Sequence, residues 1–239
     1  MLKDKFGFNF WPSFTDLMLS LVLVVLIILF VVSKMIAAGN ENLDRARDSQ
    51  MAIQTQIKNM IGSRYTIKII SDRNNKDTTK EIKDSTADIN IIDKLDRQTI
   101  TFSDKLLFDS WKSELKPAGF DVLNAVGPVI RGNLRNISEI QIQGHADIVN
   151  TDDFNLRLAS ERAISVYKFV QMNVGVDPAE NLMSITSFGK YKPIGREAGD
   201  KFDRNAVIKA NSSSLLRAKN RRIEIVLFYK NNLDKEEQK

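Results

Sequence analysis

The longest run of apolar side chains lies near the start of the chain, from Phe10 to Val32. From Leu17 onward its single polar residue is Ser20, whose hydroxyl can bond back to the preceding turn of a helix. At about 1.5 Å per residue, roughly 22 residues cover the ~30 Å hydrocarbon core of a membrane. The pattern therefore predicts one membrane-crossing helix over residues 11–33.

One acid, Asp16, lies inside this apolar segment and permits two interpretations. An acid one turn after Pro12 can sit near the lipid headgroups and offset the positive end of the helix dipole. Alternatively, Asp16 is an ion-carrying carboxylate that faces a partner subunit, because ionisable residues inside membranes are costly and usually functional. One helix cannot line a pore, so the second interpretation requires membrane helices from other subunits.

The charges that flank the apolar segment predict its orientation. Lys3 and Lys5 precede it with one opposing acid, whereas acids and bases are mixed from Glu41 onward. The positive-inside rule then places residues 1–10 in the cytoplasm and the folded part outside it. A cleaved signal peptide is the competing interpretation, but the apolar run is too long and lacks a small-x-small site before Ala37. We therefore expect a single-pass anchor.

A second periodic pattern covers residues 34–63. Apolar residues recur there mostly at steps of three and four: Leu43, Ala46, Ile53, Ile57, Met60 and Ile61. This spacing predicts an amphipathic helix that Gly62 ends. Since an isolated helix of this length is marginally stable in water, its apolar face must pack on something. A second copy of the helix and the membrane helices of a partner subunit are the two candidates.

From residue 64 onward, strand and helix patterns alternate and predict a mixed α/β sandwich, so the fold class is α+β. Apolar or alternating runs predict strands at 65–70, 89–92, 98–102, 139–143, 183–188 and 222–228. We assign residues 64–97 to a linker and the start of the folded domain, and residues 98–230 to the domain itself.

Helix signals lie between these strands. Pro117 suits a first helical position, and Asp152 or Asp153 can cap a further helix that continues until Gly175. Polar segments without a helix or strand period indicate loops or a disordered tail at 71–88, 189–214 and 231–239.

A net charge of +5 and a group of basic residues late in the chain suggest a nucleic-acid partner. Acids interrupt that group, however, and the sequence contains no helix-turn-helix, RNP or zinc-finger spacing. A solvated face or a contact with an anionic polymer is the better interpretation, so we expect no nucleic-acid partner. His145 follows a strand without a paired nucleophile. We therefore predict no enzyme activity, no catalytic residue, no metal and no cofactor.

Four separated motifs carry a resemblance to a known family: LLFDSWKSELKPAGFDVL (106–123), IQIQGHADIVNTDDFNLRLASERA (140–163), SFGKYKP (187–193) and RAKNRRIEI (217–225). With them, residues 98–228 resemble the OmpA-like peptidoglycan-binding domain. Together with an N-terminal span that carries an early acid, the architecture resembles the MotB-like family, the B subunits of flagellar motor stators. The short N-terminus and the WPSFTDLM segment are more similar to the corresponding subunit of Zorya anti-phage defence systems.

The resemblance implies a site for the diaminopimelate of the cell-wall stem peptide. The ligand-binding Asp and Arg of the family fall on Asp147 and Arg162, and residues that shape the site fall on Asn155 and Arg222. An acid for the ammonium group and a guanidinium for the carboxylate of diaminopimelate would form a clamp. Without the family motifs, Asp147 and Arg162 would be interpreted as a surface ion pair.

Two positions depart from the family pattern near this site. Ala146 replaces the usual Thr, and Trp111 stands near a position that is often Gly. Both departures bear on wall affinity and on the type of wall peptide that is bound.

The resemblance also implies partners: a homodimer, several copies of a multi-span MotA-like membrane subunit, and peptidoglycan. Residues 34–63 would then be a plug of the ion path or a linker. We predict a peptidoglycan-anchored subunit of an ion-driven, proton-driven motor in the bacterial inner membrane, with its folded domain in the periplasm or outside the cell. The Zorya-like features favour anti-phage defence. A flagellar stator subunit and a passive wall tether are the alternatives, and Asp16 discriminates motor from tether, because a passive anchor needs no buried acid.

Overall fold

The computed structural model describes residues 11–71, 78–197 and 199–230. The described residues divide into two compact units, one that extends to Asn42 and one that begins at Leu43. The predicted N-terminal segment 1–10 and the predicted tail 231–239 lie outside the described residues.

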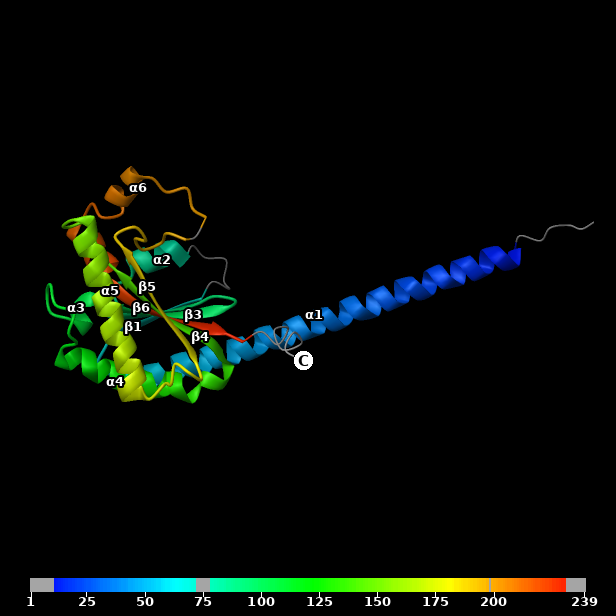
Figure 1. Ribbon diagram of the computed structural model, residues 1–239, viewed down its shortest axis with the longest axis horizontal. Coiled ribbons are helices and arrows are strands. Elements are labelled where there is room, and N and C mark those ends of the chain that lie inside the picture. Colours follow the sequence, from blue (N-terminus) through cyan, green and yellow to red (C-terminus); the bar gives the residue numbers. More distant parts are fainter. Residues whose placement is uncertain (1–10, 72–77, 198, 231–239) are drawn as a thin grey trace, which may run out of the picture. The chain divides into compact units, whose positions relative to one another are not determined.

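Helix α1 (Trp11–Ile61) runs without interruption through the segments that were predicted as two separate helices (Figure 1). It contains no proline after Pro12, and a glycine such as Gly39 costs only about 1 kcal/mol inside a helix. The side chains of residues 14–37 are all exposed. By length and composition, α1 is the one described helix that could cross a membrane, with a mean hydropathy of 3.0 in its most apolar window. So apolar a surface requires lipid or another protein around it.

The last turns of α1 belong to the second unit and pack into its core. Ile53 and Ile57 are fully buried there. Gln50 is buried with them, and its Nε2 donates to the carbonyl oxygens of Lys94 (2.8 Å) and Arg97 (3.2 Å), which flank a turn between two strands. We expected a second copy or the membrane helices of a partner to cover this face. For Ile53 and Ile57 that expectation is wrong, because the chain's own domain covers them, whereas Met60 on the same predicted face stays exposed.

Ile57→Ala should lower the free energy of unfolding of this domain by about 2–5 kcal/mol, because it empties a fully buried site. Met60→Ala is the matched control, since Met60 is about half exposed on the same helix, and its effect should stay within about 0.5 kcal/mol. Thermal unfolding of the full chain in detergent measures both. Equally small effects would mean that the helix packs elsewhere, as the dimer and plug alternatives require.

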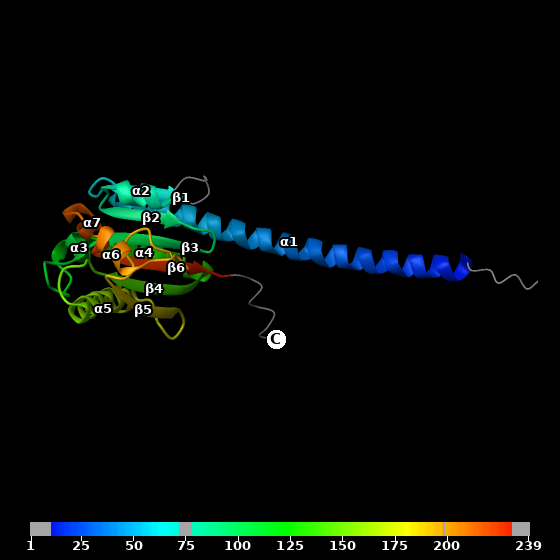
Figure 2. The same cartoon turned by 90° about the horizontal axis from the view of Figure 1, so that it is seen from above.

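A six-stranded sheet organises the second unit. The strands lie in the order β1 (Ile67–Ser71), β2 (Ile89–Asp93), β3 (Arg97–Ser103), β6 (Arg222–Tyr229), β4 (Ile137–His145) and β5 (Leu182–Gly189), from top to bottom in Figure 2. The pairs β1–β2 and β4–β5 are parallel, and the other neighbours are antiparallel. His145 pairs with Arg222, so the end of β4 lies beside the start of β6.

Helices cover the two faces of the sheet unequally. The end of α1, α4 (Pro117–Gly132) and α5 (Asp152–Phe169) enclose the apolar core, to which alternate residues of the central strands, such as Ile140 and Ile142, contribute. In Figure 1, α4 lies on one side of the sheet, and α2 and α6 lie on the other. The short helical elements are α2 (Thr78–Asp84), α3 (Asp104–Leu107), a 3₁₀ turn (Leu134–Asn136), a π-helical turn (Val170–Val174), α6 (Arg204–Lys209) and α7 (Ser214–Asn220).

The α+β class is confirmed, and each predicted strand is present with ends shifted by at most a few residues. Two segments predicted as loops are partly helical: 71–88 contains α2, and 189–214 contains α6. The cap of α5 is Thr151, whose side chain accepts from the backbone N–H of Phe154, whereas Asp152 and Asp153 occupy the first turn. A hydroxyl at the cap bonds the free N–H groups directly, and the acids act on the helix dipole from inside the turn.

Candidate functional site

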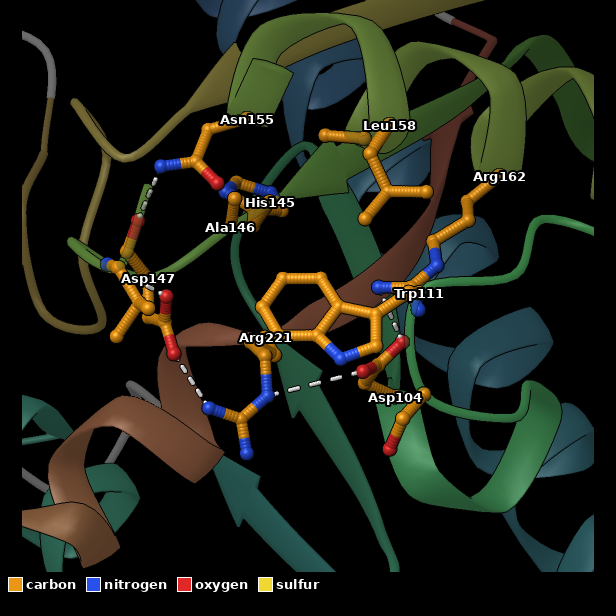
Figure 3. A pocket seen from close by; sticks show the side chains of 12 residues that line it. Asp104, Trp111, His145, Ala146, Asp147, Asn155, Leu158, Arg162 and Arg221 are labelled. Carbon is orange, nitrogen blue, oxygen red and sulfur yellow. Dashed lines mark hydrogen bonds and ion pairs between the residues drawn. The ribbon is translucent and has the colours of Figure 1, made fainter. Parts of the chain in front are cut away.

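Several charged side chains surround a cavity of about 260 Å³ beyond the end of β4 (Figure 3). The loops after β3 and β4, the first turns of α5 and the residue before β6 contribute to its wall. Its main lining residues are Asp104, Trp111, Asp147, Asn155, Arg162 and Arg221.

Close packing between β4 and α5 positions this wall. A Cβ atom at Gly144 would lie 2.0 Å from the carbonyl oxygen of Ala159, so only glycine lets the strand approach the helix backbone this closely. Asp147, on the loop after the strand, and Arg162, on the helix, consequently border the same cavity.

Asp147 is buried and held from two directions. Its Oδ1 accepts the backbone N–H of Val149 (2.9 Å), and its Oδ2 pairs with the guanidinium of Arg221. Asn155 donates from Nδ2 to the backbone oxygen of Asp147 (3.1 Å), which fixes the loop against α5. The carboxylate therefore has a fixed position on the cavity wall, as Figure 3 shows.

Arg162 pairs with Asp104 rather than with Asp147. Its NH1 lies 2.7 Å from Oδ1 of Asp104, and its Nε and NH2 donate to the backbone oxygens of Lys112 (2.8 Å) and Asp109 (3.3 Å). Burial raises the pKa of Asp104, although the guanidinium groups of Arg162 and Arg221 act against this. Arg162 thus holds the loop between α3 and α4 as well as the cavity wall.

Arg221 completes a chain of alternating charges. Besides pairing with Asp147, its Nε lies 3.7 Å from Oδ2 of Asp104, and its side chain remains 40% exposed. Two acids and two guanidinium groups therefore alternate along the wall in the order Asp147, Arg221, Asp104, Arg162. Such a wall suits a ligand that carries both an ammonium and a carboxylate group.

The structure brings three of the four expected wall-binding residues together: Asp147, Asn155 and Arg162 line one cavity. Arg222 does not line it. Arg222 is the first residue of β6, opposite His145, and its side chain is buried there. Its Nε donates to a carboxylate oxygen of Glu224 (2.6 Å). The other expectation, a plain surface pair of Asp147 with Arg162, is wrong, because both side chains are buried and each pairs with a different residue.

Sequence reasoning missed Asp104 and Arg221. Side chains of neighbouring residues in a strand point to opposite faces of the sheet. Once the register of β6 is known, this alternation shows that Arg221 and Arg222 point in different directions, and Arg221 is the one that lines the cavity. Asp104 lies two residues before the motif that begins at Leu106 and carries no pattern of its own. Its signal is its position directly after β3, next to β6 in the sheet.

The two departures from the family pattern both lie at the cavity. Ala146 lines it, and Trp111 covers it with a side chain that is 61% exposed. The backbone of Trp111 has φ 64°, in the left-handed region that favours glycine, which explains why glycine suits this position. The indole ring lies 5.8 Å from the ring of Phe154, centroid to centroid. The indole ring of Trp111 therefore forms part of the cavity lining, where a glycine would have no side chain.

His145 borders the cavity, but its ring belongs to a buried polar cluster. Nδ1–H donates to the carbonyl oxygen of Lys192 (3.2 Å), and Nε2 lies 3.3 Å from the Glu224 carboxylate without forming a hydrogen bond. Burial and the neighbouring Arg222 lower the pKa of His145 to about 4, which Glu224 only partly offsets. The imidazole is consequently neutral at pH 7, and its role is structural.

This low pKa predicts a pH-dependent stability. Between about pH 6.5 and pH 4, the unfolded chain binds a proton at His145 and the folded chain does not, so the free energy of unfolding falls as the pH is lowered. From pH 7 to pH 5 the loss should be about 2 kcal/mol. His145→Gln keeps a donor for Lys192 and should remove this part of the pH dependence in thermal unfolding. An identical dependence in the variant would assign it to other groups.

Comparison with known proteins agrees with the fold. The sequence model of the OmpA family matches residues 107–206. Outer membrane protein A of Bordetella avium is 30% identical over 126 residues, which are 53% of this chain and 55% of that protein. Peptidoglycan-associated lipoprotein of Pseudomonas aeruginosa is 28% identical over 87 residues, 36% of this chain and 48% of that protein. The chain thus spans about half the length of the curated relatives it matches.

The crystal structure of a MotB-like protein from Desulfovibrio vulgaris is similar in fold. It superposes with a TM-score of 0.55 at 19% identity and covers 80% of this chain and 96% of that one. The second unit is therefore an OmpA-like domain with a charged cavity. An apolar helix precedes this domain in the chain. The fold is similar to that of the MotB-like protein.

Proposed function

We propose that this chain anchors a membrane complex to peptidoglycan. The observation that carries the proposal is the alternating row of Asp147, Arg221, Asp104 and Arg162 around a cavity in an OmpA-like domain. The name of the Pseudomonas aeruginosa relative refers to peptidoglycan, which supports the same ligand. The apolar part of α1 supports a membrane anchor, with the domain in the periplasm or outside the cell.

The charges suggest how diaminopimelate binds. The side chain of diaminopimelate ends in an ammonium and a carboxylate group, which need an acid and a guanidinium at fixed spacing. Arg162 is held by backbone oxygens and cannot move far, whereas Arg221 is 40% exposed. We expect Arg221 to turn from Asp147 toward the ligand carboxylate, which frees Asp147 for the ammonium group. Trp111 and Leu158 offer apolar contact to the methylene chain.

Retention of the full chain, in detergent, on purified wall material tests the proposal. We expect retention on peptidoglycan that contains diaminopimelate, and competition by a soluble stem peptide that contains it. Lysine-type peptidoglycan lacks the side-chain carboxylate, and losing a buried charged partner costs roughly 2–5 kcal/mol. Binding to it should therefore be at least about 30-fold weaker. Equal retention on both wall types would contradict a diaminopimelate site.

A second function follows from the other unit. We propose that the anchored complex is an ion-driven motor of the stator type and that the ion is the proton. In this complex a homodimer of this chain contacts several copies of a multi-span MotA-like subunit. The supporting observation is Asp16 in a helix segment whose apolar side chains are all exposed in the single chain. Partner helices would cover that surface and enclose the acid. The segment would cross the bacterial inner membrane with its N-terminus in the cytoplasm.

The two machines of this type differ in output. The WPSFTDLM segment and the short N-terminus favour the anti-phage defence machine over the flagellar motor. Phage plaque counts and swimming assays on a strain that lacks this chain distinguish the two. Loss of phage protection with normal swimming supports the defence function, whereas loss of swimming supports the flagellar alternative.

A further inference from the structure

A second cavity, also of about 260 Å³, adjoins the first one. Asp104 and Arg221 line both cavities, and these two side chains form an ion pair with each other. The second cavity has its wall on the other side of this pair, between α2, β3 and α7. Each cavity is smaller than the roughly 300–1,000 Å³ of pockets for drug-sized ligands, and it suits a fragment such as one amino-acid residue.

Part of the second cavity is built by residues that precede the OmpA family match. Ile82 lies on α2, and the residues from Ser85 to Asp88 connect α2 to β2. The match begins at residue 107. Helix α2, the segment that follows it and Asn90 on β2 thus supply a wall beside the first cavity.

The wall combines apolar side chains with two hydroxyls that have no hydrogen-bond partner among the described residues. Ile82, Ala87, Ile194 and Leu215 provide apolar surface, and Leu215 lies at the start of α7. Thr101 and Ser103 contribute hydroxyl oxygens that are buried and form no hydrogen bond with any described residue. Buried hydroxyls without partners are unfavourable, and a ligand that supplies the missing hydrogen bond would remove this cost.

The charges at the second cavity are predominantly positive. Lysine and arginine side chains outnumber acids in its wall: Lys105, Lys219, Arg221 and Arg222 against Asp88 and Asp104. Arg222 is occupied by Glu224, and Arg221 by the two aspartates. Lys105 is exposed and forms no ion pair with a described residue. An anionic ligand group at the rim of the cavity can therefore pair with Lys105 without breaking an ion pair to another described residue.

We propose that this second cavity binds the C-terminal residue of the wall stem peptide, a residue with a small apolar side chain and a free carboxylate. The inference rests on the proposed binding of diaminopimelate in the first cavity. Only the free end of the stem peptide fits a cavity of this size, because the other end is attached to a glycan strand. The alanine that follows diaminopimelate has the required chemistry: its methyl group meets the apolar wall, its peptide group meets Thr101 and Ser103, and its carboxylate meets Lys105.

Calorimetry of the full chain in detergent with two synthetic stem peptides tests this site. One peptide ends at diaminopimelate, and the other carries one further D-alanine. We expect the longer peptide to bind at least about tenfold more tightly, and amidation of its terminal carboxylate should remove most of the gain. Thr101→Val and Lys105→Gln should each reduce binding of the longer peptide and leave the shorter one unchanged. Thr99→Val is the control, since Thr99 lies two residues earlier on the same face of β3 and outside this cavity.

Stability measurements separate a ligand role from a structural role. Thr101→Val removes a hydroxyl that bonds to none of the residues the structure describes, so the melting temperature of the variant should equal or exceed that of the parent chain. A lower melting temperature would assign the hydroxyl to the fold and overturn its role in binding. Equal affinities for the two peptides would overturn the second cavity while wall binding stands. Failure of both peptides to bind would overturn the proposed wall binding itself.

Discussion

Asp147→Asn should weaken retention on diaminopimelate-type peptidoglycan by about 30-fold or more. The substitution keeps the size of the side chain and an oxygen that can accept from the backbone N–H of Val149. It removes the negative charge that pairs with Arg221 in the free protein and, in the proposed complex, meets the ligand ammonium. Loss of one member of a buried charge pair costs roughly 2–5 kcal/mol. Pull-down with purified wall material and calorimetry with a soluble stem peptide measure the effect.

Asp153→Asn is the matched control. Asp153 is exposed on the first turn of α5 and lies outside the cavity, so the control removes the same charge nearby and should bind normally. Circular dichroism should show that both variants are folded. Undiminished binding by Asp147→Asn would place the clamp on other residues.

Arg162→Ala is a less specific probe of the same cavity. It removes the hydrogen bonds to Lys112 and Asp109 and leaves the carboxylate of Asp104 without its nearest partner. A buried charge that loses its partner destabilises a fold by about 3–5 kcal/mol. Weak binding by this variant would therefore combine lost contact with lost structure.

Asp16→Asn should abolish the biological output of the complex while the complex still assembles. Asparagine keeps the size and polarity of the side chain but cannot gain and lose a proton, so an ion carrier at this position stops working. Asp16→Glu should retain partial output at best, because it moves the carboxylate by about one methylene in a site whose geometry controls transfer. Phage protection, swimming and co-purification with the membrane partner are the readouts.

Ser20→Ala controls for changes to the helix itself. The Ser20 hydroxyl bonds to the backbone oxygen of Asp16, one turn before it, and its removal leaves the carboxyl group in place. We expect near-normal output from this variant. Full output from Asp16→Asn would eliminate the ion-carrier role and favour the passive tether.

The position of the end of α1 changes how the plug hypothesis can be tested. Deletion of residues 41–61 would remove Ile53 and Ile57 from the core of the domain. A loss of output would then follow from unfolding, whether or not the segment blocks an ion path. Substitutions on the exposed side of the helix, such as at Met51, leave the core intact and are the informative ones.

Elements with a strong local period were predictable from the sequence. The apolar run of α1 needs no partner to be recognised, because its length alone matches a membrane. Pro117 marks the start of α4, since proline is favoured at a first helical position. The strands were recognised by alternation or by short apolar runs, which depend on neighbouring residues only.

Contacts between distant residues were decided by the tertiary structure. Arg162 pairs with Asp104, and Asp147 pairs with Arg221, because the register of β3, β6 and β4 brings their ends together. No local pattern encodes that register, and family motifs mark positions without stating partners. The burial of Ile57 likewise depended on which surface lay opposite. The sequence therefore determined which faces of the elements are apolar and which residues carry charge, and the packing of the sheet determined which of them meet.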